Sequence, residues 1–449
     1  MTLTEAAYWS KRFGVIVGVV VVIIFGVLML LFSKPKNVAP PEYLTANCAC
    51  TANKEDFLSE ELNIGSLELG ADSELVFQVE TASGQIDALP NIINVYEFDN
   101  KGQSLSSQLQ AAEIANNLGF NPEGVIRKNE QTYVWLDTSR HRTLEVDART
   151  LNFILTTDTD YIRDISSKAS VPSDSEAISL ATNVLRQANL LDSNYTDSTS
   201  YKEVYKIDIN PDGSYSEAAS TNDADLIRVD FYRRKPMINI RENIENSEEM
   251  VSTLEKSILS TEDDIFKKSE EEVTYEGERI NIYNFSTLVL HESPVKTNIS
   301  VYVGAKDENA QEMQNIYRIE YTNWPIKEYP CGTYELISPS EAIQKIQEGE
   351  GSLVSLIPLE NGEGDKVSPY QTRTVTNFFI HNIYITYYEP EEEANFLQPI
   401  YVVVGSAYLE NEEKAGFTFY VPAVNYELVT DAIESAETIN DETTNTTDL

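Results

Sequence analysis

Cysteine is scarce in this chain of 449 residues, which contains only Cys48, Cys50 and Cys331. Three cysteines are too few for the disulfide framework that replaces a hydrophobic core in small secreted proteins. In an oxidising compartment, one cysteine of the N-terminal pair can bridge to Cys331, which leaves an odd thiol. A bond between Cys48 and Cys50 would close a very small and strained ring. The partner of Cys331 is therefore left open between these two cysteines.

Histidine is equally scarce. The chain contains His141, His291 and His381, and none of them lies at a metal-ligand spacing from another histidine or from a cysteine. This excludes the ligand spacing of a structural zinc site. The chain also lacks a G-x-S-x-G motif, an H-E-x-x-H motif and a glycine-rich phosphate-binding loop. Its acidic pairs and runs are typical of solvated surface. We therefore predict no catalytic residues, no cofactor and no enzymatic activity.

Basic residues are few as well, because 33 lysines and arginines stand against 73 aspartates and glutamates, giving a formal net charge of -40. A body with this charge is repelled by nucleic acid and by anionic lipid head groups, so nucleic acid is excluded as a partner. Apolar residues are not scarce. They make up 41% of the chain, with 25 tyrosines and 16 phenylalanines, which is enough to build buried cores.

Only one long apolar run occurs, Phe13–Phe32, and it contains neither charge nor proline. About 20 such residues in a helix span the roughly 30 Å hydrocarbon core of a bilayer. We therefore predict a transmembrane helix over residues 13–33, preceded by a short cytoplasmic tail over 1–12 and followed by a linker over 34–44. Gly14 and Gly18 form a GxxxG pattern, which either packs two membrane helices together or is tolerated facing lipid.

The anchor has two features that need weighing. A cleavable signal peptide is the alternative, but its apolar region is typically only about 7–15 residues long, and the candidate cleavage position near Ala39 is weak. The basic residues on the two sides of the run nearly cancel in the positive-inside count. The short N-terminal tail favours Met1 in the cytoplasm and the bulk of the chain outside the cell membrane.

Beyond the linker, the hydrophobic pattern repeats one order of elements, a helix followed by several strands. Two helices begin with the sequence of a capping box, Ser173–Glu176 and Ser338–Glu341. Helical and alternating apolar periods identify the remaining elements. Helices are predicted over 104–118, 173–188 and 247–259 and from Ser338 to 346. Strands are predicted over 74–79, 92–98, 132–136, 143–147, 151–155, 201–209, 226–232, 299–303, 317–321, 378–388, 399–405 and 417–421.

We interpret this order as an α+β ectodomain of repeated helix-on-antiparallel-sheet units, tethered by one N-terminal transmembrane helix. Unit one covers 45–165, unit two covers 166–330 and unit three covers 331–430. The most acidic and least patterned region, near 237–278, is interpreted as an insertion in unit two. Residues 431–449 lack core potential and are predicted to form a disordered acidic tail.

Unit three contains a capped helix and three strand segments in a recognisable order, Ser338–Ile346, Ile383–Glu389, Phe396–Gly405 and Phe417–Val424. This part, about the last quarter of the chain, resembles the C-terminal sheet-and-helix module of YycH/YycI-type proteins. The resemblance implies a single-pass bacterial protein whose extracytoplasmic domain, built of PepSY-like units, regulates a sensor kinase. No catalytic motif accompanies that family, so the resemblance supplies no active-site residue. The acidic middle region departs from the family, which leaves the specific partner open.

One metal candidate stands out. Asp208, Asn210 and Asp212 match positions 1, 3 and 5 of a calcium-binding loop, and Gly213 matches its turn. The position of the bidentate glutamate is occupied by Ala219. The same Asn-Pro-Asp-Gly stretch is a strong reverse-turn sequence, because proline fixes φ and glycine accepts a positive φ. The turn is the favoured interpretation and calcium the alternative.

The sheet of unit three is the predicted binding surface, with Tyr384, Tyr388 and Tyr401 as anchors for a partner. An antiparallel sheet of this size usually leaves an edge, and an edge accepts an extended segment by strand addition. The acidic run Glu389–Glu393 would guard one rim of this sheet. The alternative is that these tyrosines, like Trp324, pack helix against sheet.

Together these features predict a single-pass, membrane-anchored extracytoplasmic binding and regulatory protein. It would be monomeric or weakly dimeric and would act on another envelope protein, such as a sensor kinase. The alternative is a cell-wall-directed hydrolase or a glycan- or peptide-binding protein. A hydrolase requires a cleft with convergent, desolvated carboxylates of shifted pKa, so the structure of the ectodomain can separate the two.

Overall fold

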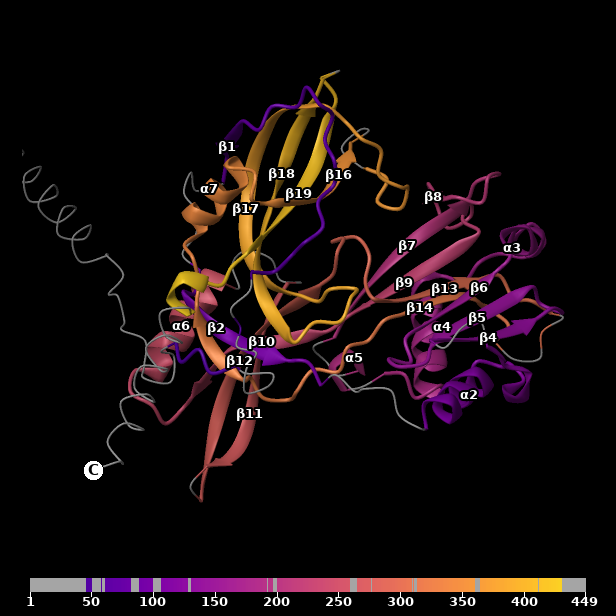
Figure 1. Ribbon diagram of the computed structural model, residues 1–449, viewed down its shortest axis with the longest axis horizontal. Coiled ribbons are helices and arrows are strands. Elements are labelled where there is room, and N and C mark those ends of the chain that lie inside the picture. Colours follow the sequence, from indigo (N-terminus) through magenta and orange to yellow (C-terminus); the bar gives the residue numbers. More distant parts are fainter. Residues whose placement is uncertain are drawn as a thin grey trace, which may run out of the picture. The chain divides into compact units, whose positions relative to one another are not determined.

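The computed structural model describes residues 46–50, 58, 61–81, 89–99, 106–127, 131–191, 193–196, 200–258, 265–275, 277–308, 310, 313–359, 364–410 and 412–429 (Figure 1). The apolar run Phe13–Phe32, with Gly14 and Gly18, and the predicted tail over 431–449 lie outside these residues. Among the residues that are described, no helix is both long and apolar enough to cross a membrane.

Nine strands form one antiparallel sheet in the order β3-β4-β5-β6-β14-β13-β9-β7-β8. Its two halves meet where β6 pairs with β14, with Phe153 opposite Tyr321. The strands are β3 (Ile126–Arg127), β4 (Thr132–Asp137), β5 (Arg142–Asp147), β6 (Phe153–Thr157), β7 (Tyr201–Ile209), β8 (Tyr215–Glu217), β9 (Leu226–Tyr232), β13 (Ile299–Gly304) and β14 (Ile316–Tyr321).

Helices α2 (Ser107–Asn117) and α4 (Asp174–Gln187) share one apolar core with this sheet (Figure 1). Small residues on the helices, including Ala111 and Ala181, bring them close to the strands. The sheet contributes large side chains such as Trp135 and Phe231, all buried. Alternation explains the register, because Ile227, Val229 and Phe231 of β9 all point into this core.

Ten strands form a second, mixed sheet along the path β10-β12-β17-β18-β19-β16. Strand β11 pairs with β12, β1 pairs with β17 in parallel, and β2 pairs with both β15 and β18. The strands are β1 (Phe77–Val79), β2 (Ile92–Glu97), β10 (Arg234–Arg241), β11 (Phe266–Tyr275), β12 (Glu278–Leu290), β15 (Gly332–Glu335), β16 (Ser352–Pro358), β17 (Val375–Tyr388), β18 (Phe396–Leu409) and β19 (Lys414–Pro422).

The predicted fold class is therefore wrong. Strands from predicted units one and two share the nine-stranded sheet, and strands from unit one join those of unit three in the ten-stranded sheet. The acidic region near 237–278 is not a separate insertion, because it contributes β11 and most of β10 to the ten-stranded sheet. The physical reason is that apolar periodicity identifies a strand but does not identify its pairing partner. Two large, strand-rich sheets replace three small repeated units.

The starts of α4 and α7 test the two predicted capping boxes. At the start of α7 (Pro339–Gln347), the Glu341 N–H donates to Ser338 Oγ and the Ser338 N–H donates to Glu341 Oε2, so this capping box is confirmed. The capping box at Ser173 is wrong, because its side chain makes no cap hydrogen bond. The other helical segments are η2 (Pro122–Gly124), α3 (Thr159–Ser166), α5 (Ser193–Thr196) and α6 (Ser247–Ile258).

A disulfide joins Cys50 to Cys331 and leaves Cys48 as a half-buried thiol. The bond packs in a small apolar cluster with Val95 and Tyr334, which lie on the paired strands β2 and β15. It therefore attaches the start of the described chain to the ten-stranded sheet.

Candidate functional site

The face of the nine-stranded sheet opposite α2 and α4 is divided. One part is a small apolar cluster that includes Ile162 of α3, Leu226 and Tyr317, and beside it lie charged and polar side chains. Because side chains alternate along a strand, Arg228 and Asp230 of β9 point away from the apolar core. The strand register places Tyr205, Arg228, Tyr302 and Arg318 in one row across β7, β9, β13 and β14. The adjacent row contains Glu203, Asp230, Ser300 and Glu320. We call these two rows the polar face.

Arg228 and Asp230 form the centre of the polar face. Arg228 Nη2 lies 3.1 Å from Asp230 Oδ2, and the Ser300 hydroxyl donates to Asp230 Oδ1 at 2.6 Å. Arg228 also stacks on the Tyr205 ring, 4.3 Å from its centroid. Burial raises the pKa of Asp230 to about 6, and the Arg228 charge only partly opposes that effect. This carboxyl group is therefore set to titrate in mildly acidic solution.

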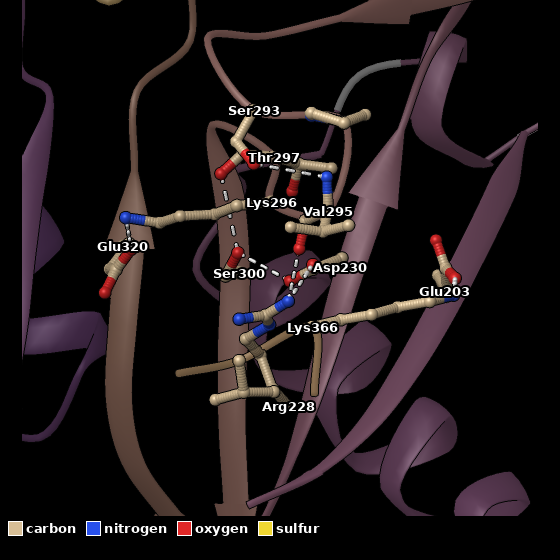
Figure 2. Close-up of polar contacts among 12 residues, drawn as sticks. Glu203, Arg228, Asp230, Ser293, Val295, Lys296, Thr297, Ser300, Glu320 and Lys366 are labelled. Atoms are coloured by element: carbon tan, nitrogen blue, oxygen red, sulfur yellow. Dashed lines mark hydrogen bonds and ion pairs between the residues drawn. The ribbon is translucent and has the colours of Figure 1, made fainter. Parts of the chain in front are cut away.

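The segment His291–Asn298, which we call the connector, links β12 of one sheet to β13 of the other and lies over the polar face (Figure 2). Arg228 Nη2 donates to Val295 O at 2.5 Å, and the Tyr232 hydroxyl donates to Pro294 O at 3.3 Å. Lys296 Nζ lies 2.7 Å from Glu320 Oε2. Arg228, Tyr232 and Glu320 of the sheet thus hold the connector in place.

A cavity of about 480 Å³ lies on one side of the connector, and we call it the carboxylate cleft. Among the described residues, five carboxylates line it, from Glu145, Asp147, Glu292, Glu320 and Glu391. Burial and the neighbouring acids Glu391 and Glu392 raise the pKa of Glu292. The pKa of Glu320 is lowered, because Lys296 and Arg318 outweigh the effect of its burial.

A larger cavity of about 940 Å³ lies on the other side of the connector, between β7 and β16. We call it the groove. Residues of β7 and the β8 end form one wall and residues of β16 the other, while Glu292, Ser293 and Val295 of the connector also line it. Among the lining residues that the structure describes, three are basic and three acidic: Lys206, Lys366 and Arg373 with Glu217, Glu292 and Asp365.

Backbone groups of β7 face the groove. Asp225 N–H donates to Ile207 O, so odd-numbered residues of this stretch direct their backbone groups toward the β9 side. Even-numbered residues point the other way, as the bond from Ala218 N–H to Lys206 O shows. Val204 therefore presents its N–H and C=O to the groove, where no described strand pairs with it.

The opposite wall has the same property. Strand β16 ends the path of the ten-stranded sheet and, among the described strands, pairs only with β19. On its outer edge, Leu353 O accepts from the Leu67 N–H and the Leu353 N–H donates to Ser66 Oγ, so the open part of this edge lies beyond Leu353. Leu359 N–H donates to Lys414 O on the β19 side, so Leu356 presents its backbone groups away from β19. Leu356 also lines the groove. Two strand edges from different sheets thus border one cavity.

A buried ion pair lies where the two sheets join. Arg233 Nη2 is 2.6 Å from Glu389 Oε1, both side chains are fully buried, and Arg233 also donates to Trp324 O at 2.9 Å. His291 Nδ1 lies 3.8 Å from Glu389 Oε2. Burial and the Arg233 charge lower the pKa of His291 to about 3, so this imidazole is neutral. Arg233 follows β9 and Glu389 follows β17, so the pair joins the sheets.

The prediction for the acidic run Glu389–Glu393 is therefore wrong at its first residue. Glu389 is fully buried beside Arg233, and burial raises the pKa of its carboxyl group. Glu391, Glu392 and Glu393 are exposed, as expected of a charged rim. Sequence alone treats the run as uniform, because it does not reveal the buried cation that compensates one of its members.

The calcium candidate forms a turn in the structure. The stretch after Ile209 reverses the chain into β8, with Gly213 at φ +84° and the Asp212 carboxylate accepting from the Ser214 N–H at 2.9 Å. Asn210 Nδ2 donates to Ser214 Oγ, so it also serves the turn. Burial and Asp225 raise the pKa of Asp208. In the part of the chain that the structure describes, no cluster of three His, Cys, Asp or Glu could hold a metal ion.

The three predicted anchor tyrosines are buried. Tyr384, Tyr388 and Tyr401 are 8%, 1% and 1% exposed, and the Tyr401 hydroxyl donates to Ile337 O. Side chains that the core encloses cannot serve as exposed anchors for a partner, so their assignment to a binding surface is corrected. Their packing role was the alternative weighed from the sequence, and the structure favours it for these residues.

Sequence reasoning missed Arg228, Asp230 and Arg233. A signal was present, because Arg233, Arg234 and Lys235 are three consecutive basic residues in a strongly acidic chain. All three are buried, with at most 7% exposure. Alternation in β9 predicts its apolar side, but it does not predict that the charged side is covered.

Comparisons with known proteins give no family. No protein-family model matches the chain, and no curated protein matches it. One solved structure, an uncharacterized protein from Eubacterium rectale ATCC 33656, is similar over 78% of this chain and 88% of its own, with 10% identity and a TM-score of 0.35. That score is too low to carry an argument. The resemblance to YycH/YycI-type proteins therefore stays a prediction.

Proposed function

We propose that this chain is a membrane-anchored, extracytoplasmic binding and regulatory protein that accepts an extended segment of another envelope protein in the groove. The observation that carries the proposal is the pair of strand edges, at Val204 and Leu356, that border one cavity of about 940 Å³. The predicted anchor Phe13–Phe32 supports a location at the cell membrane.

Strand addition is the mode of binding that the groove favours. An extended segment pairs its backbone with the exposed N–H and C=O groups of an edge strand, while alternate side chains enter neighbouring pockets. Val204 supplies such a pair of groups from the nine-stranded sheet. Leu356 supplies another from the ten-stranded sheet, so a bound segment would contact both sheets.

The charges of the groove indicate which segments it tolerates. The whole chain carries more than twice as many acidic as basic residues, whereas the lining residues of the groove that the structure describes include three of each. Lys366 also lies 3.9 Å from Glu203, and its N–H donates to Glu217. A segment of low net charge would therefore enter without the repulsion that the rest of this acidic surface exerts.

Photo-crosslinking in the native membrane tests the proposal. A photoreactive amino acid at Lys206 or Arg373, on the two sides of the groove, is expected to capture one and the same envelope protein. The exposed Leu109 on α2, which does not line the groove, is the control position. Capture of the same protein from Leu109 at equal yield would contradict a site in the groove.

A pair of backbone variants sharpens the test. Val204→Pro removes the N–H that faces the groove but breaks no bond to β9, so the strand should persist. Val204→Thr keeps the N–H. Capture from Lys206 should fall at least about tenfold with proline, as expected for the loss of about 1.4 kcal/mol, and remain with threonine. If the proline variant folds and a probe at Lys206 still captures the envelope protein at full yield, binding by strand addition at Val204 is contradicted.

A second candidate function rests on the carboxylate cleft. Its Glu292 and Glu320 have pKa values shifted in opposite directions, which is the arrangement of a general acid and a general base. This favours a hydrolase of cell-wall glycan or peptide as the alternative. Release of soluble fragments from isolated cell wall by the full-length chain, abolished by Glu292→Gln, would support it. Absence of any release would leave the binding function preferred.

A further inference from the structure

A third cavity, of about 540 Å³, lies where one face of α2, along its whole length, and the C-terminal end of α4 meet the turn before β6 and the segment after β14. Its lining is unusual in composition, because five side-chain carboxamides converge on it. They belong to Gln110, Asn117, Asn152, Asn189 and Asn323. We call it the amide cavity. It is separate from the groove, so a ligand bound in it is independent of the proposed function.

The carboxamides differ in how they are engaged. Asn323 is fixed, because its Oδ1 accepts from Arg233 Nη1 at 3.3 Å and its Nδ2 donates to the Tyr321 hydroxyl at 3.3 Å. Asn152 Oδ1 accepts from the Asn323 N–H at 3.0 Å, which orients its Nδ2 as a donor. Gln110, Asn117 and Asn189 make no side-chain hydrogen bond to any residue that the structure describes. A rigid back wall thus faces amides that are available to a ligand.

The charge of the amide cavity is low. Arg149 Nη1 is paired with Glu393, which leaves Glu113 as the one uncompensated charge among its described lining residues. Carboxamides both donate and accept hydrogen bonds without a net charge. A ligand matched to them is itself neutral and rich in groups that donate and accept.

The apolar part of the lining adds a second requirement. Ile114, Leu151, Leu190, Trp324 and Pro325 contribute surface between the amides. Trp324 is held in place by its indole N–H, which donates to Pro390 O at 3.0 Å. A ligand must therefore present apolar C–H faces as well as hydroxyl or amide groups. A volume of this size is typical of sites for small organic ligands.

An extended peptide fits these features less well. The strands that border the amide cavity, β6 and β14, are paired on both sides, so they offer no free edge for backbone addition. A saccharide needs no edge, since its hydroxyls bond to side-chain amides and its ring faces pack on apolar residues. We propose that the amide cavity binds a neutral oligosaccharide.

Calorimetric titration of the full-length chain tests this. The probes are the tetramer of N-acetylglucosamine and the tetramer of glucose, and saturable binding of at least one is expected. Asn117→Leu should weaken binding at least about tenfold, equivalent to about 1.4 kcal/mol. The matched control is Asn116→Leu, its exposed neighbour on α2 that does not line the cavity, and it should leave affinity within about twofold.

The salt dependence of binding also tests whether the amide cavity binds a neutral saccharide. Affinity should be nearly independent of salt, because no ion pair is formed on binding. Absence of saturable binding for both tetramers, equal weakening by the two leucine variants, or a steep fall in affinity with salt would each overturn the proposal. Val204→Pro should leave saccharide binding intact, so failure of the groove and failure of the amide cavity are distinguishable.

Discussion

The two sheets differ in what covers their faces. In the nine-stranded sheet, α2 and α4 cover an apolar face, while the opposite face carries Arg228 and Asp230 under the connector. In the ten-stranded sheet, β17, β18 and β19 contain long runs that are buried on both faces. Aromatic rings fill that interior, including Phe378 against Phe77, Phe417 and Phe419.

This difference shows how a burial pattern alone can mislead. All seven residues of β9 are buried, as are the last six of β17, yet only β9 places a charged pair in its interior. Burial of apolar groups stabilises regardless of pH, whereas burial of ionisable groups links stability to proton binding. The polar face should therefore make the nine-stranded sheet sensitive to pH, whereas the aromatic packing around Phe378 should contribute a stability that does not depend on pH.

The largest effect is expected in the aromatic interior. Phe378→Ala should lower the free energy of unfolding by about 3–5 kcal/mol, because it empties a site that is fully buried and surrounded by three rings. The loss should be equal at pH 5 and pH 8 in urea unfolding. Phe379→Ala, at the half-buried neighbouring position, should cost less. A loss that changes with pH would break the proposed contrast between the sheets.

An intermediate effect is expected at Asp230. Because its folded pKa of about 6 lies above its ordinary value of 3.8, the folded state binds more protons than the unfolded state between these values. The contribution of Asp230 to the free energy of unfolding therefore falls as pH rises from about 4 to 6, by about 3 kcal/mol in all. Asp230→Asn lacks this term, so the variant should gain stability relative to the unsubstituted chain across that window.

Urea unfolding of both proteins at several pH values between 4 and 7 measures this difference. The exposed Asp212 provides a control of opposite sign, because hydrogen bonds from Ser214 lower its pKa. Asp212→Asn should therefore lose stability relative to the unsubstituted chain as pH rises through the acidic range. Parallel pH profiles for Asp230→Asn and the unsubstituted chain would remove the basis for calling the polar face pH-sensitive.

The smallest effect is expected at a surface ion pair. Asp164 in α3 and Lys168, just after the end of that helix, form an i,i+4 pair in which both side chains are more than 60% exposed. Such pairs are screened by water and salt, so Lys168→Met should change the free energy of unfolding by no more than about 0.5 kcal/mol. Thermal or urea unfolding measures it. A loss above about 1 kcal/mol would show that charge on this sheet matters outside its buried face as well.

Local structure was predictable from the sequence only in part, because β10, β11, β12 and β16 have no counterpart among the predicted strands. Strand β9 and helix α7 lie where their apolar periods and polar starts place them, because those signals depend on neighbouring residues. The pairing of β6 with β14 and of β1 with β17 was not predictable. These partners are separated by more than 150 residues, and many strands share the same alternation.

The candidate site was less predictable than the strands. Arg228 and Asp230 alternate with apolar residues as a solvent-facing pair would, but the connector and the Tyr205 ring cover them. The groove depends on Val204 and Leu356, two ordinary apolar residues whose importance lies in backbone direction. Sequence patterns describe side chains, so a site made of unpaired backbone groups leaves no signal in them.

The disulfide between Cys50 and Cys331 has a mechanical consequence. The nine-stranded sheet, from Ile126 to Tyr321, lies entirely inside the covalent loop that this bond closes. Tension applied to the chain before Cys50 therefore passes through the sulfur bridge directly to Cys331 and β15. When the chain is pulled between its ends, the covalent path through the disulfide bypasses the polar face and the connector while the bond is intact. After reduction of the disulfide, the pulling force would pass along the chain through the nine-stranded sheet. The oxidation state of one bond therefore determines which part of the chain bears the force.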